Sequence, residues 1–114
     1  VVRSCEQWLG EHLRDSDAIQ QVLMQRNIPE RTLKRRFKAA TGSTLIDYLQ
    51  NLRVEAAKRL LETGQMPVDE ISASVSYEDP SFFRRLFKRR TGLTPAAYRR
   101  MFQPVFDASI TGRN

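Results

Sequence analysis

One fourteen-residue pattern occurs twice in this chain of 114 residues, and the second copy starts fifty positions after the first. The pattern reads Arg-x-Phe-Lys-x-x-Thr-Gly-x-Thr-x-x-x-Tyr. A period of this length predicts one small structural unit used twice. The fixed positions are Arg35, Phe37, Lys38, Thr41, Gly42, Thr44 and Tyr48, which recur as Arg85, Phe87, Lys88, Thr91, Gly92, Thr94 and Tyr98.

Apolar residues recur at intervals of three and four along most of the chain, and no stretch shows the sustained alternation of a strand. The chain is therefore predicted to be all-α. Its longest helix is expected between a cap at Thr44 and a stop at Gly64, with about 18 residues and a length of roughly 27 Å. Shorter helices are expected around Trp8 to Leu13, from a cap at Ser16-Asp17 to a break at Asn27-Ile28-Pro29, from Glu30 to Ala40, from Val68 to Val75, from Asp79-Pro80 to Thr91-Gly92, and from Thr94-Pro95 to Phe102.

Positive charge is concentrated in the two copies of the pattern. The net charge of +6 and the pI near 10.1 indicate an anionic partner. No acidic residue occurs from Arg31 to Ile46 or from Pro80 to Phe106, so two positive patches on a mixed surface are expected. The basic residues of the two copies are Arg31, Lys34, Arg35, Arg36 and Lys38, then Arg84, Arg85, Lys88, Arg89, Arg90, Arg99 and Arg100.

Each repeated helix divides into an apolar face and a basic face when its residues are placed at 100° intervals. A helix-turn-helix unit presents such a helix to the major groove, where arginine can donate two hydrogen bonds to guanine and lysine can neutralise phosphates. Both helices are therefore interpreted as DNA-reading elements. The inward residues are Leu33, Phe37 and Ala40, then Phe83, Leu86 and Phe87; the outward residues are Arg31, Lys34, Arg35 and Lys38, then Ser81, Arg84, Arg85 and Lys88.

The long middle helix fits the geometry of a duplex. Successive major grooves on one side of DNA lie about 34 Å apart, and this helix covers most of that distance. One chain could thus contact two adjacent grooves without forming a dimer. Because the two basic faces differ in sequence, the recognised site is expected to be asymmetric.

These residues resemble the DNA-binding domain of the AraC/XylS family of bacterial transcription regulators, over roughly Asp17 to Phe102. The most specific segment runs from Tyr77-Glu78-Asp79-Pro80-Ser81-Phe82-Phe83-Arg84-Arg85 through Leu86-Phe87-Lys88 into Thr91-Gly92-Leu93-Thr94-Pro95 and Tyr98-Arg99. The stretch Tyr48-Leu49-x-x-Leu52-Arg53-x-x-x-Ala57-x-x-Leu60-Leu61 resembles the connecting helix of the family.

The resemblance implies a seven-helix fold with two helix-turn-helix subdomains, at about 17–42 and 68–92, joined by a linker helix at about 45–62. The domain is expected to cover residues 1–106, followed by a disordered tail at 107–114. The implied base-reading residues are Arg31, Lys34 and Arg35 in the first unit, and Pro80, Ser81 and Arg85 in the second. Phosphate contacts are expected from Lys38, Arg84, Lys88 and Arg89.

The resemblance also implies promoter binding, activation through contact with RNA polymerase, and a bacterial, cytoplasmic, nucleoid-associated location. An N-terminal sensor or dimerisation domain is expected outside this chain, which begins at Val1 without a methionine. Some positions depart from the family pattern. Asn27 and Pro29 replace a usual glycine and serine, Leu23 replaces a small residue, and Ser76 replaces a glycine.

Two other functions compete with DNA binding as interpretations of the sequence. An enzyme is disfavoured, because the chain has a single histidine, His12, a single cysteine, Cys5, and no glycine-rich phosphate loop. No catalytic or metal site, no cofactor and no membrane-spanning segment is expected. A basic helical module that binds RNA or an acidic protein is the remaining alternative, although the repeated aromatic residues face inward rather than outward for base stacking.

Overall fold

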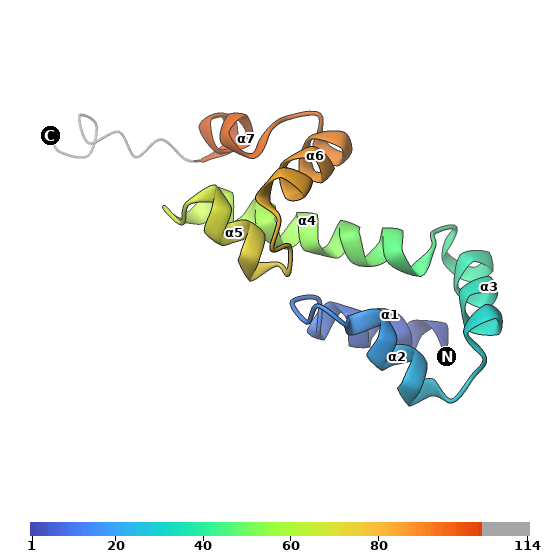
Figure 1. The fold of residues 1–114 in the computed structure, drawn as a ribbon. Helices are drawn as coiled ribbons and strands as arrows, with labels where there is room; N and C mark the ends of the chain where they lie inside the picture. Colours follow the sequence, from blue (N-terminus) through green and yellow to red (C-terminus); the bar gives the residue numbers. More distant parts are fainter. Residues whose placement is uncertain (104–114) are drawn as a thin grey trace, which may run out of the picture.

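The computed structural model describes residues 1–103, so the tail predicted at 107–114 lies outside the described residues. Within residues 1–103 the chain forms seven helices and no strand, which confirms the all-α fold (Figure 1). The helices are α1 (Val2–Glu11), α2 (Ala18–Arg26), α3 (Glu30–Thr41), α4 (Leu45–Thr63), α5 (Val68–Ser74), α6 (Pro80–Thr91) and α7 (Pro95–Phe102).

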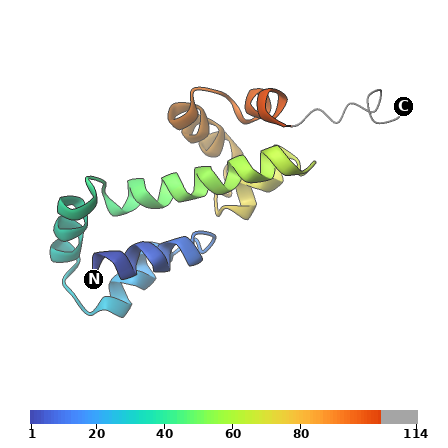
Figure 2. The same cartoon turned by 180° about the vertical axis from the view of Figure 1, so that it is seen from behind.

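Two separate hydrophobic cores share the long helix α4. The first core is built by α1, α2, α3 and the start of α4, with Phe37 and Leu49 among its members. The second is built by the rest of α4 together with α5, α6 and α7, and it contains Phe83 and Phe87. Figures 1 and 2 show α1 and α2 on one side of α4, α3 at one end, and α6 on the other side. The linker helix therefore holds two small subdomains.

The repeated pattern forms the same tight turn after α3 and after α6, at Thr41–Thr44 and Thr91–Thr94; each turn is called a corner. Gly42 and Gly92 have φ of 79° and 85°, and each N–H donates to the lysine carbonyl four residues earlier at 2.8 Å. These left-handed values suit glycine, which ends each helix as predicted.

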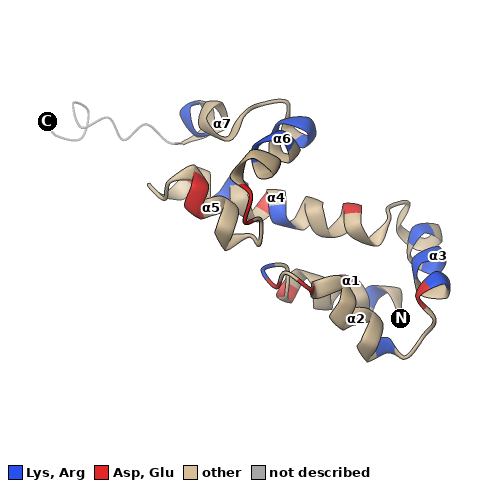
Figure 3. Cartoon of the chain, in the orientation of Figure 1, with Lys and Arg blue, Asp and Glu red and all other residues tan. Residues whose placement is uncertain are grey.

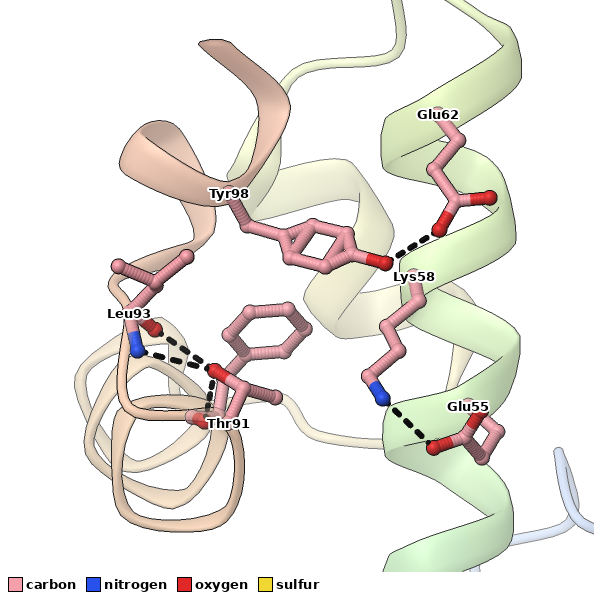
Figure 4. Close-up of polar contacts among 7 residues, drawn as sticks. Glu55, Lys58, Glu62, Thr91, Leu93 and Tyr98 are labelled. Atoms are coloured by element: carbon pink, nitrogen blue, oxygen red, sulfur yellow. Dashed lines mark hydrogen bonds and ion pairs between the residues drawn. The ribbon is translucent and has the colours of Figure 1, made fainter. Parts of the chain in front are cut away.

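Threonine hydroxyls complete each corner. The Thr91 hydroxyl donates to the Phe87 carbonyl at 2.9 Å and accepts from the Leu93 N–H at 3.1 Å (Figure 4). Thr41 makes the equivalent bonds in the first copy. Thr94 then caps α7 by accepting from the Ala97 N–H at 3.1 Å. Thr44 caps α4 in the same way, which confirms the predicted cap.

Two local predictions were wrong. Ala40 is exposed, because α3 meets the first core only through its Leu33 and Phe37 stripe. Asp17 stands at the start of α2, yet it makes no side-chain cap bond; its carboxylate accepts from Gln21 one turn along instead.

Three of the four positions that depart from the family pattern lie in the turns next to helices, and the fourth, Leu23, lies within α2. Asn27 is left-handed with φ of 52°, a conformation that glycine and asparagine adopt more readily than other residues. Pro29 precedes α3 with φ of −54°. Ser76 also has a positive φ, 74°, which explains why glycine would suit this position. Leu23 is half-buried against the first core.

Candidate nucleic-acid interface

Helix α3 presents the basic face that the sequence predicted. Leu33 and Phe37 are fully buried. Arg31, Arg35 and Lys38 are exposed on the opposite side, as is Lys34, which pairs with Glu30 at 2.6 Å. Both partners of this pair are about half exposed, and exposed pairs contribute little to stability, so Lys34 can exchange Glu30 for a phosphate or base.

Helix α6 presents an equivalent face, beginning at a capped N-terminus. Asp79 accepts from the Ser81 N–H at 3.0 Å, and Pro80 occupies the first turn, half-buried. Ser81 itself is exposed. The side chains of Phe83, Leu86 and Phe87 point into the second core, whereas Arg85, Lys88 and Arg89 are exposed.

Among residues 1–103, Arg84 is the one predicted contact on α6 that pairs with an acidic residue of another helix. Its guanidinium pairs with the Asp69 carboxylate of α5, and both side chains remain substantially exposed. The pair orients Arg84 at the junction of α5 and α6. A phosphate would therefore compete with Asp69 for this arginine.

Basic residues colour most of the turns of α3 and α6, whereas acidic residues lie at the start of α3, in the turn before α6, on α4, on α5 and beside the loop after α1 (Figure 3). The ten predicted site residues thus lie on two helices that are separated along α4. Within each helix they share one face.

Two basic residues of the repeats do not join these patches. Arg90 donates to the Gln50 amide oxygen at 2.8 Å and pairs with Asp47 at 3.3 Å. Arg99 donates to the Met66 carbonyl at 2.7 Å and to the Leu61 carbonyl at 3.4 Å. Both arginines therefore hold helices together, so the positive patches are smaller than the sequence suggested.

Sequence reasoning gave no role to Arg53, which is only 5% exposed on α4. Its guanidinium donates to the Leu13 and Asp15 carbonyls, both at 2.7 Å. A signal was available in the sequence, because Arg53 stands four residues from both Leu49 and Ala57 in the apolar stripe of the helix.

Tyr98 of α7 is a buried titratable group that packs against α6. Its hydroxyl donates to the Glu62 carboxylate of α4 (Figure 4). Burial of the phenol, together with this hydrogen bond, raises the pKa of Tyr98 to about 12. Tyr98 thus stays neutral at physiological pH and serves the packing of α7 against α4.

Residues 1–103 show neither a metal site nor a membrane-spanning helix. Residues 1–103 contain no cluster of three or more side chains suited to holding a metal ion. None of the seven helices combines the length and apolar character needed to cross a bilayer. The paired basic helices are therefore the strongest candidate site.

Comparison with known proteins agrees with this geometry. A family described as "Helix-turn-helix domain" matches residues 25–101. The HTH-type transcriptional activator RhaR of Salmonella dublin is 34% identical over 93 residues, which are 82% of this chain and 33% of RhaR. The chain thus spans about a third of the length of the curated relatives it matches.

Solved structures extend the match to the fold. The C-terminal domain of AraT, a response regulator from Geobacillus stearothermophilus, superposes with a TM-score of 0.87 at 30% identity, covering 93% of this chain and 88% of that one. The DNA-binding domain of AdpA, solved with a target DNA, gives 0.82 at 34% identity, covering 89% and 91%. The chain therefore belongs to the AraC/XylS family of helix-turn-helix DNA-binding domains.

Proposed function

We propose that this chain is a sequence-specific, double-stranded DNA-binding regulator of transcription that places α3 and α6 in two successive major grooves. The observation that carries the proposal is the shared construction of the two helices. Each is fixed by buried aromatic and aliphatic side chains, ends at the same Thr-Gly corner and exposes a basic face. The AdpA domain, a relative solved with target DNA, supports the same use of the fold.

The length of α4 supports contact with adjacent grooves. Its 19 residues correspond to about 28 Å at 1.5 Å per residue, against about 34 Å between successive grooves. The reading helices also have their own width, which adds to the span. One chain can thus reach both grooves without a partner.

In this proposal the two helices divide the contacts between bases and phosphates. Arginine and lysine on α3 read base edges, as do the side chains of the first turns of α6, where Pro80 can offer only apolar contact. Because the two sets of side chains differ, the site is asymmetric. The base-reading residues are Arg31, Lys34, Arg35, Pro80, Ser81 and Arg85, and the phosphate contacts are Lys38, Arg84, Lys88 and Arg89.

The proposed regulatory role is activation of transcription from a promoter. Promoter activation through contact with RNA polymerase is supported by the RhaR relatives, which are named activators. A sensor or dimerisation domain would act together with this one, in keeping with relatives whose chains extend far beyond the matched region.

Selection of bound duplexes from a random pool tests the proposal. We expect one asymmetric consensus with two conserved blocks, one helical turn apart. Enrichment of a single block, or a palindrome, would contradict contact by two different reading helices. If a single-stranded RNA pool or an acidic polypeptide competes better than any duplex, the chain is a basic module of another kind.

A further inference from the structure

The two subdomains meet directly at a seam between two loops. The loop from α1 to α2 (residues 12–17) belongs to the first subdomain, and the turn from α5 to α6 (residues 75–79) belongs to the second. The Ser76 hydroxyl of the turn donates to the Arg14 carbonyl of the loop. Leu13 packs against both hydrophobic cores. The turn that leads into α6 thus lies against the first subdomain.

Arg53 of α4 occupies the centre of this seam. Two of its guanidinium nitrogens donate to the Leu13 and Asp15 carbonyls at 2.7 Å each. Its guanidinium carbon lies 5.1 Å from the centroid of the Tyr77 ring, which belongs to the turn before α6. One side chain therefore binds both loops.

The chemistry of this contact suits arginine and not lysine. A planar guanidinium can donate in two directions while its face stacks on an aromatic ring, whereas an ammonium is a point charge without such a face. Arg53 is 5% exposed, so its hydrogen bonds to the carbonyls compensate for the removal of its charge from water.

Tyr77 carries this contact into the second reading helix. Its ring packs against Phe82 and Phe83 of α6, with centroids 5.4 and 6.2 Å away. The far end of α6 is fixed as well, because Arg90 bonds Gln50 and Asp47 in the half of α4 that serves the first core. Helix α6 is thus held at both ends relative to the subdomain that carries α3.

We propose that Arg53 is a positioning residue that sets the spacing between the two reading helices, and thereby the number of base pairs that the chain accepts between its half-sites. This inference rests on the proposed function, since it requires both helices to bind one duplex. Without the Arg53 clamp the subdomains can rotate about α4, so DNA sites of unequal spacing become acceptable.

The test measures affinity of the 114-residue chain for the selected duplex and for duplexes with one base pair added or removed between the half-sites. Each change shifts one half-site by about 3.4 Å and rotates it by about 34°. Wild type should lose about tenfold or more in affinity on each change, because rigidly linked reading helices can no longer both bind their half-sites. Arg53→Lys should lose about threefold or less on the same changes.

A matched control is available within the second subdomain. Arg99 also donates to two carbonyls, but it joins α7 to the end of α4 and does not cross the seam. Arg99→Lys should lower the unfolding temperature while keeping the spacing discrimination of wild type. Tyr77→Leu removes the ring from the other side of the clamp and is measured in parallel, so the conclusion does not depend on the folding of one variant.

The outcomes separate this inference from the function on which it rests. If wild type discriminates spacing and the folded Arg53→Lys and Tyr77→Leu proteins discriminate equally well, the positioning role is wrong while two-groove binding stands. If Arg99→Lys relaxes the discrimination as much as Arg53→Lys, the effect is general destabilisation and the inference fails. If wild type itself accepts every spacing, two-groove binding by a rigid chain is wrong, and the inference falls with it.

Discussion

Phe37 and Tyr48 pack edge to face, with ring centroids 5.3 Å apart and planes inclined at 78°. Fifty residues later Phe87 and Tyr98 do the same, at 5.5 Å and 81°. Such edge-on pairs are a favoured aromatic geometry. The repeat therefore encodes mainly a structural corner, in which α3 packs on α4 and α6 packs on α7. The arginine and the lysine are the only charged residues among its fixed positions, and they are exposed in both copies.

Removing the buried phenylalanine of either repeat should destabilise the subdomain to which it belongs. Phe87→Ala should lower the free energy of unfolding by about 3 to 5 kcal/mol, because a fully buried phenyl ring is replaced by a cavity. Phe37→Ala should cost a similar amount in the first core. Urea unfolding followed by circular dichroism measures both. A variant as stable as wild type would show that the ring lies outside the core.

The corner glycines are required for their backbone conformation and not for space. Gly92 has φ of 85°, and a Cβ added there would meet no atom within 4 Å. Gly92→Ala should therefore cost about 1 to 2 kcal/mol from the left-handed conformation alone. Gly10 lies in the helical backbone of α1 and has equally open surroundings, so Gly10→Ala should stabilise by about 0.5 to 1 kcal/mol. Effects of the same sign in thermal unfolding would refute this assignment.

Base reading and phosphate binding should separate by substitution. Arg85→Ala should cost about 1 to 3 kcal/mol on the preferred duplex and relax the preference at one base pair. Lys38→Ala should weaken binding to all sequences alike and reduce the salt dependence of the affinity by about one phosphate contact. Titration of labelled duplexes at several salt concentrations measures both. Equal losses on every sequence for Arg85→Ala would make it a phosphate contact.

The sequence predicted what depends on local rules. Glycine and threonine at helix boundaries and the apolar stripes decide where helices begin, end and pack, so α3, α6 and their corners were predictable. Contacts between residues far apart in sequence were not. Arg90 and Arg99 look like surface charge in sequence, and only the fold brings their guanidinium groups to Gln50 and to the Met66 carbonyl.

Arg53 belongs to the same class of unpredicted contact. Its place in an apolar stripe indicates burial, but its partners lie 38 and 40 residues earlier in the chain. Ala40 shows the opposite error. Its helical position predicted an inward-facing side chain, but the first core does not extend to it and Ala40 is exposed. Periodicity gives the direction of a side chain, but not the extent of the surface against which it packs.

The pKa of Tyr98 gives a prediction at alkaline pH. It is raised from 10.0 to about 12, first by burial and then by the hydrogen bond to Glu62. The folded chain favours the neutral phenol. The contribution of Tyr98 to the free energy of unfolding is therefore complete below pH 10 and is lost as the pH rises from 10 to about 12. Tyr98→Phe cannot ionise.

The difference in unfolding free energy between wild type and Tyr98→Phe should therefore fall across that range, measured by urea unfolding at a series of pH values. All other titrating groups are common to both proteins and cancel in the difference. A constant difference from pH 10 to 12 would show that burial does not perturb this phenol.

Dimethyl sulfate footprinting of the chain on its selected duplex tests the central claim most directly, because methylation of guanine N7 reports which major grooves one monomer covers. We expect protection in two successive major grooves on one face of the DNA, about 10 base pairs apart, at protein concentrations where the chain is monomeric. Protection of a single groove, or of two grooves only when a second chain binds, would contradict the account that α3 and α6 read one site together.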